Sequence, residues 1–245
     1  MLLATGLVAG AVNSVAGGGS LLTFPTLLAL GYPAVQANVT NTVGVFPGNL
    51  SGTAAFRREL TGQLEPLIRC GIAACAGAAA GSVLLLRTSE SVFRRTVPAL
   101  ILLAAALVLV QPVVSDRLRR ASRSTETERA WTAPVAVGVI AIYGGYFGAA
   151  VGVMLIAALG VLIVDTLVRV NALKTAMQLA VNGTSAVLFA VFAPVAWGPA
   201  LTLAIATTAG GYAGAGVARR LPELWLRAVI VAIGVAAAIT VAVRG

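Results

Sequence analysis

Residues 10–20 read Gly10-Ala11-Val12-Asn13-Ser14-Val15-Ala16-Gly17-Gly18-Gly19-Ser20, and they interrupt an apolar run that extends from Leu2 to Leu30. This run is longer than the roughly 20 residues that one helix needs to cross a bilayer. Three consecutive glycines let the helix break, and non-helical backbone at membrane depth must be buried in protein or line a wet cavity. The half-helix after the break would point N–H groups and a positive dipole end into that cavity, which favours an anion. Close helix packing through small residues is the alternative. The candidate substrate-binding residues here are Asn13, Gly17, Gly18 and Gly19.

The composition around this stretch is that of a membrane protein. The chain has 245 residues, of which 59% are hydrophobic and 10% charged, and its mean hydropathy is +0.96. So few charges cannot build a soluble surface, and disordered chains are charge-rich, so both classes are excluded. The chain has no histidine, and Cys70 and Cys75 lie five residues apart in one apolar block. The usual zinc ligands and general base are thus missing, and we expect no enzyme, metal or cofactor.

The apolar residues fall into eight blocks, which predict an all-α, polytopic membrane fold. The first and fifth blocks are too long for one simple crossing and contain glycine clusters, so we expect them to be broken or re-entrant. The blocks are residues 2–30, 37–56, 64–86, 97–114, 133–164, 170–192, 199–218 and 224–243.

An internal repeat relates the two halves of the chain. When the sequence is shifted by 133 positions, scarce residues coincide, such as Asn49 with Asn182 and Pro66 with Pro199. Gly77 and Gly81 fall on Gly210 and Gly214, and both pairs are small-xxx-small motifs that predict close helix packing. We therefore predict a single membrane domain with a first repeat at 1–114, an Arg-rich cytoplasmic linker at 115–130 and a second repeat at 131–245. Such repeats are typical of secondary transporters, which bind substrate between the halves.

The distribution of basic residues favours inverted repeats. If the first and fifth blocks enter and return, only Arg87, Arg94, Arg95 and Arg244 fall outside. The other thirteen of the seventeen basic residues then fall inside, as the positive-inside rule requires. If all eight blocks cross once, the basic residues divide almost evenly, so the hairpin arrangement fits better.

Polar side chains recur on the second and sixth blocks, at positions that the repeat relates. Interhelical hydrogen bonding is one explanation, and a substrate path near a pseudo-symmetry axis is the other. The candidate residues are Asn38, Asn41, Thr42 and Asn49 in the second block, and Lys174, Gln178 and Asn182 in the sixth.

Lys174 is the single lysine of the chain. A charge inside the membrane is a functional candidate by default. Near a helix end, however, a lysine can extend its ammonium group to the interface. The sequence leaves both anion binding and this snorkelling open.

Residues 10–20, Phe24-Pro25, residues 28–31 and the stretch Ala37-Asn38-Val39-Thr40-Asn41-Thr42 resemble the TauE/SafE family of membrane transporters, also called the sulfite exporter family. The second half departs from the pattern, because Ala150 and Val151 align with Gly17 and Gly18. The resemblance implies a multi-pass transporter of the cytoplasmic membrane. It also implies anionic substrates, such as sulfite, sulfonates or sulfur-containing organic acids.

We expect secondary transport of a small anion by alternating access, and a passive anion channel of the same architecture is the alternative. No nucleotide-binding motif occurs, which leaves the proton gradient or the anion's own gradient as the driving force. The expected partners are the substrate anion, protons as a coupling ion and the lipid bilayer. Nucleic acid is not expected, because the basic residues lie between apolar blocks, and a homo-oligomer is compatible with the sequence.

Overall fold

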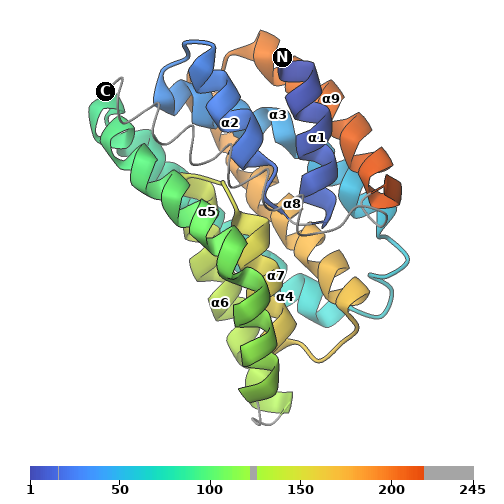
Figure 1. The fold of residues 1–245 in the computed structure, drawn as a ribbon. Coiled ribbons are helices and arrows are strands. Elements are labelled where there is room, and N and C mark those ends of the chain that lie inside the picture. The colour runs from blue at the N-terminus through green and yellow to red at the C-terminus, as the bar shows by residue number, and fades with distance from the viewer. Residues whose placement is uncertain (16, 122–125, 218–245) are drawn as a thin grey trace.

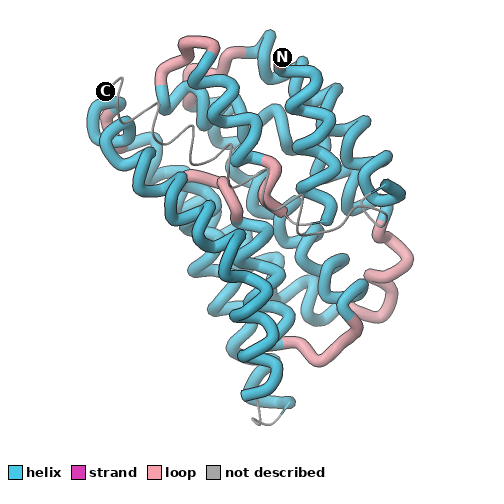
Figure 2. Tube along the Cα trace, in the orientation of Figure 1, coloured by secondary structure: helices cyan, strands magenta, loops and turns pink. Residues whose placement is uncertain are grey.

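The computed structural model describes residues 1–15, 17–121 and 126–217, and the described part is helical, with short loops (Figures 1 and 2). This confirms the expected all-α class. Its helices are α1 (Leu2–Val15), α2 (Ser20–Ala29), α3 (Ala34–Ala55), α4 (Leu64–Arg87), α5 (Glu90–Ala121), α6 (Glu126–Tyr146), α7 (Val151–Leu162), α8 (Leu167–Phe192) and α9 (Trp197–Val217). The eighth apolar block lies outside the described residues.

The first and fifth blocks are helical hairpins. In Figure 1, α1 runs from the top of the molecule to its middle and α2 returns to the top, whereas α6 and α7 approach the middle from the opposite end. At about 1.5 Å per residue, the ten residues of α2 span only about half of a 30 Å hydrocarbon core. The chain can reverse because Gly17, Gly148 and Ala150 have φ angles of 79°, 76° and 59°. The glycines adopt this left-handed region without steric cost.

Several helices have the length and surface of membrane-spanning segments. Among the described residues, three are long and apolar enough to cross a bilayer: Leu64–Arg87, Glu90–Val110 and Leu167–Phe192. Large apolar side chains face outward on neighbouring helices, such as Ile72, Val187 and Ile205, each at least 64% exposed. Such a surface suits lipid rather than water. The chain is thus a multi-pass membrane protein.

The helix bounds agree with the predicted repeat. Helices α3 and α8 begin at Ala34 and Leu167, and α4 and α9 begin at Leu64 and Trp197, so each pair differs by 133 residues. The hairpin helices α2 and α7 end at Ala29 and Leu162, with the same difference. Helices α5 and α6 extend into the expected linker from both sides, so that only residues 122–125 separate them.

Each half of the chain has one helix that packs mainly against the other half. Helix α4 packs against α6 and α8 of the second half, whereas α9 packs against α1 and α3 of the first half. Glycines make both contacts close, because a Cβ atom on Gly77 or Gly81 would collide with α6 backbone. A Cβ on Gly210 would likewise collide with the backbone of Leu7. The packing role predicted for these motifs is confirmed at the three glycines; the side-chain surroundings of Gly214 are not described.

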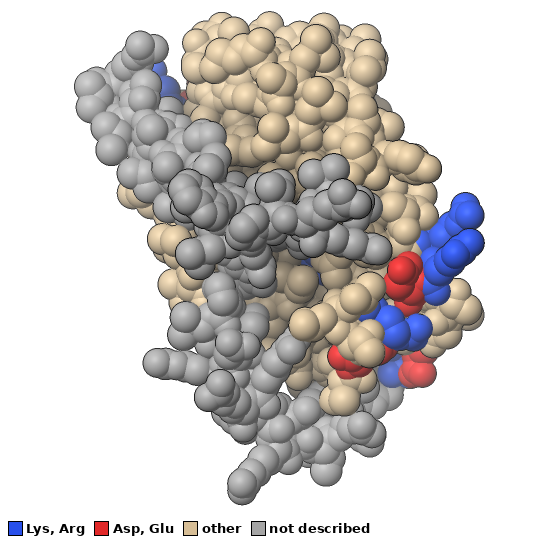
Figure 3. Space-filling model, turned by 45° about the vertical axis from the view of Figure 1, so that its right-hand side comes forward, with Lys and Arg blue, Asp and Glu red and all other residues tan. Residues whose placement is uncertain are grey.

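Exposed charged side chains lie in the α3–α4 loop and, at the opposite end of α3, around the junction of α4 and α5. Figure 3 shows a large mixed group of basic and acidic side chains at one edge and a smaller, partly hidden charged group at the upper opposite side, whereas the remaining visible described surface is largely uncharged. Arg57 and Arg58 are exposed in the loop between α3 and α4. The loop's Thr61 carbonyl accepts a hydrogen bond from Arg169 Nη1 at 3.1 Å, which joins the loop to the start of α8. This end is the one that the positive-inside count assigns to the cytoplasm, and the assignment stays a prediction.

Candidate functional site

The tip of the first hairpin is closed by an asparagine side chain. The Gly19 N–H group donates to Asn13 Oδ1 at 2.7 Å, and Gly17 N–H donates to the Val12 carbonyl at 3.0 Å. A Cβ atom on Gly19 would collide with the backbone of Ala9. The glycine triplet is therefore the site of a real helix break, and Asn13 caps the first turn of α2.

The two hairpin tips touch each other. A Cβ atom built on Gly17 would lie 2.5 Å from the backbone of Gly152, and one built on Gly152 would lie 2.5 Å from Gly17 Cα. Since α2 and α7 both begin here, two half-helix N-termini meet in the protein interior. The positive ends of the two helix dipoles make this region electropositive.

Lys174 lies beside these tips and is completely buried. Its Nζ donates to the Asn13 backbone carbonyl at 3.1 Å, and Gln178 Nε2 donates to Asn13 Oδ1 at 3.5 Å. The structure thus brings Asn13, the glycine triplet, Lys174 and Gln178 together. Snorkelling is wrong for Lys174, because the packed hairpin covers its ammonium group.

The polar residues of α3 divide between the two hairpins. Thr23 of α2 donates to Asn41 Oδ1. Asn38 Nδ2 instead donates to the Tyr146 carbonyl at the end of α6, at 3.0 Å, and Thr42 Oγ1 donates to the Asn38 carbonyl at 3.0 Å. Asn41 therefore belongs to the first tip, whereas Asn38 and Thr42 lie near the second.

Asn49 and Asn182 are buried on α3 and α8, which pack against each other. The Asn49 Nδ2 donor is buried without a hydrogen-bond partner. A buried, unpartnered amide donor is costly, and an acceptor from a ligand would satisfy it. Within the described part of the chain, no hydrogen bond joins the two side chains, and their shared site stays a prediction.

Asn171, the counterpart of Asn38 at the 133-residue offset, was not among the predicted site residues. Its Nδ2 donates to the Ser14 carbonyl near the end of α1, at 3.3 Å, as Asn38 Nδ2 does at the end of α6. Applying the repeat to every asparagine of the second block would have found it.

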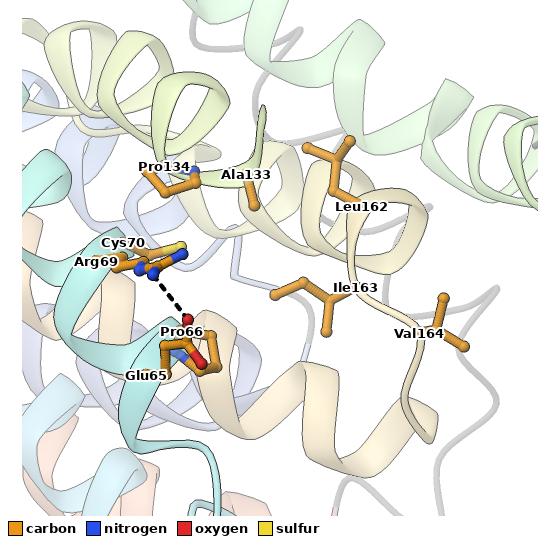
Figure 4. A pocket seen from close by; sticks show the side chains of 9 residues that line it. All are labelled: Glu65, Pro66, Arg69, Cys70, Ala133, Pro134, Leu162, Ile163 and Val164. Atoms are coloured by element: carbon orange, nitrogen blue, oxygen red, sulfur yellow. Dashed lines mark ion pairs between the residues drawn. The ribbon is translucent and has the colours of Figure 1, made fainter. Parts of the chain in front are cut away.

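A cavity of about 320 Å³ lies elsewhere, between the start of α4, α6 and the loop after α7 (Figure 4). Its lining includes Glu65 and Arg69, which form an ion pair at 2.9 Å. None of the predicted site residues lines it, so this cavity is distinct from the site at the tips.

Asp165 lies outside the membrane-spanning segments, between α7 and α8. Its Oδ2 accepts from Arg169 Nε at 2.7 Å, and this hydrogen bond lowers the carboxyl pKa. The pair fixes the entry into α8, as expected of a charge at a helix end.

The family model described as "Sulfite exporter TauE/SafE" matches residues 2–241. The chain belongs to the TauE/SafE family. A similar TauE/SafE relative is a "Probable membrane transporter protein" of Haemophilus influenzae, 26% identical over 94% of this chain and 89% of its own length. Another is "Probable membrane transporter protein YfcA" of Escherichia coli K12, 26% identical over 90% of this chain and 79% of its own length. No solved structure matches the chain significantly.

Proposed function

We propose that this TauE/SafE protein is a secondary transporter that moves a small anion across the cytoplasmic membrane by alternating access. Sulfite, sulfonates and sulfur-containing organic acids are the proposed substrates. They would bind beside the two hairpin tips, where Asn13, Lys174 and Gln178 lie.

The observation that carries this proposal is the complete burial of Lys174. The two ion pairs that the described residues form, Glu65–Arg69 and Asp165–Arg169, do not involve it. A buried ammonium group without a carboxylate partner is costly. A bound anion would compensate its charge, so the site is suited to a negatively charged substrate.

Neutral donors around Lys174 support the same class of substrate. The N-termini of α2 and α7 meet at the hairpin tips, and half-helix N-termini of this kind hold anionic groups in transporters. Gln178 Nε2 has a single long hydrogen bond, at 3.5 Å, and Asn49 Nδ2 has none. These amides can donate to an anion without placing further charge in the membrane.

The contact between Gly17 and Gly152 favours a carrier over a passive channel. The tips block the centre of the protein, so an ion passing between them requires movement of a hairpin. A catalytic role has less support: the chain has no histidine, and the described residues contain no cluster of His, Cys, Asp or Glu side chains that could hold a metal ion.

The test is flux of radiolabelled sulfite and taurine into vesicles that contain the purified protein, with and without a pH gradient. A carrier should saturate and should be accelerated by unlabelled substrate on the opposite side of the membrane. Unsaturable flux without this acceleration would favour the channel. If neither anion moves faster than in protein-free vesicles, the proposed substrate class is wrong.

A further inference from the structure

The C-terminal ends of α1 and α6 are related by the repeat, but their backbone carbonyl groups accept hydrogen bonds from different side chains. At the end of α1, the Lys174 ammonium binds the Asn13 carbonyl at 3.1 Å and the Asn171 amide binds the Ser14 carbonyl at 3.3 Å. The last carbonyls of a helix carry partial negative charge, which a cation stabilises. Lys174 brings that positive charge to α1.

At the end of α6 the same positive charge is missing. Asn38, the counterpart of Asn171, binds the Tyr146 carbonyl at 3.0 Å. The residue that corresponds to Lys174 is Asn41, which is neutral, and its side-chain oxygen accepts from Thr23 on the other hairpin. At the 133-residue offset Tyr146 corresponds to Asn13, so at α6 a neutral amide binds the carbonyl that the ammonium binds at α1, and no ammonium group is present.

An acceptor oxygen remains unsatisfied beside this helix end. Asn38 is only 1% exposed, and its Oδ1 atom is buried without a hydrogen-bond partner. Because Oδ1 and Nδ2 belong to one planar amide, the bond from Nδ2 to Tyr146 holds Oδ1 close to the end of α6. The backbone beyond Tyr146 leaves the helix, with a φ of 76° at Gly148, so the last carbonyl groups of α6 have no following helical turn to bind them.

We propose that a monovalent cation, with sodium as the probe, binds at the C-terminal end of α6. Asn38 Oδ1 and carbonyl oxygens of the α6–α7 break would coordinate it, beside the helix end that lacks an ammonium group. Neutral amide and carbonyl oxygens suit a monovalent ion, whereas Mg²⁺ and Ca²⁺ sites usually include carboxylates. Unwound backbone and helix C-termini coordinate Na⁺ in other secondary transporters. As a coupling ion, this cation rests on the proposed anion transport, but its binding does not.

The test compares the melting temperature of the detergent-purified full chain in sodium chloride and in choline chloride at equal concentration. Chloride and ionic strength are then matched, so only the cation differs. The wild type should melt several degrees higher in sodium, since a ligand that binds the folded state stabilises it. Asn38→Leu should abolish this difference. Asn171→Leu, the matched control at the end that already holds Lys174, should retain it.

A second variant adds the missing charge. Asn41→Lys copies the arrangement of the second half, so its melting temperature should not depend on sodium. Binding of radioactive sodium gives an independent readout, and it should saturate in the wild type and be lost in Asn38→Leu.

Equal melting of the wild type in both salts, or sodium binding that survives in Asn38→Leu, would overturn the site. Anion flux that does not depend on sodium would overturn the coupling role of the cation, while leaving the proposed anion transport intact. Sodium binding without any anion flux would instead refute the transport function and leave the cation site standing.

Discussion

Replacing Lys174 by methionine separates a substrate-binding role from a structural one. The side chain keeps its unbranched shape and loses its ammonium group. In the described structure this group makes one hydrogen bond, at 3.1 Å, to the Asn13 carbonyl. A hydrogen bond to a charged group contributes about 1.5–3 kcal/mol, whereas burying an ion costs several kcal/mol. The free energy of unfolding of Lys174→Met should therefore stay near the wild-type value or rise.

Substrate affinity should change in the opposite direction. If the ammonium donates to the bound anion, its removal costs roughly 1.5–3 kcal/mol of binding free energy. At 1.4 kcal/mol per factor of ten, the Kd for sulfite should rise about 10- to 150-fold. An isothermal titration of the purified protein measures the Kd, and thermal melting without substrate reports stability.

The control is Arg95→Met, which removes one positive charge from an exposed position on α5. It should leave the Kd for sulfite unchanged, which excludes an effect of net charge alone. A Lys174→Met protein that melts at a lower temperature but binds sulfite like the wild type would refute the reasoning. Lys174 would then be a structural tie between α8 and the end of α1.

Three other changes test the site and its surroundings. Gly17→Ala should be less stable than Gly31→Ala and should lose transport. Both glycines have a positive φ, which costs alanine about 1–2 kcal/mol, but only the Cβ at residue 17 collides with the other hairpin. Equal melting temperatures of the two alanine variants would contradict this. Asn49→Leu and Asn182→Leu should each weaken substrate binding by about one to two orders of magnitude. In a double-mutant cycle their effects on the binding free energy should not be additive, whereas additive effects with unchanged affinity in each single mutant would remove both residues from the site. Asp165→Asn should lower stability by at most about 1 kcal/mol at neutral pH, because its ion pair is partly exposed. Because the pKa of Asp165 is lowered in the folded state, its ion pair stabilises the protein above the unfolded pKa of about 3.9, and this stabilisation is lost as the pH falls below that value. The melting temperatures of the mutant and the wild type should therefore converge in acid.

The fold could be predicted largely from apolar block lengths and glycine clusters. The break after Val15 follows from the glycine triplet, since no other residue type accepts the φ of Gly17 so easily. The start of α5 was less predictable. Its first turns, from Glu90 to Thr96, are mostly polar, so the continuous apolar run begins only at Val97, seven residues after the helix does.

The site could be predicted only in part. Sequence spacing placed Lys174 and Gln178 on one helix face, but the burial of Lys174 depends on a hairpin about 160 residues away that folds over it. The pairing of Gly17 with Gly152 is also tertiary, because the repeat aligns Gly152 with Gly19 instead. Local patterns do not contain such contacts between halves.

The exchange of α4 and α9 between the halves has a consequence for biosynthesis. Gly77 and Gly81 emerge from the ribosome before the α6 backbone against which they pack. At about 5–20 residues per second, the 65 residues from Gly81 to the end of α6 at Tyr146 take about 3–13 s to translate. During this interval the glycine face of α4 lacks the α6 backbone that covers it in the folded protein. The first half therefore cannot complete its packing during its own synthesis. A polypeptide that ends between α5 and α6 leaves the ribosome with α4 lacking its partner helix.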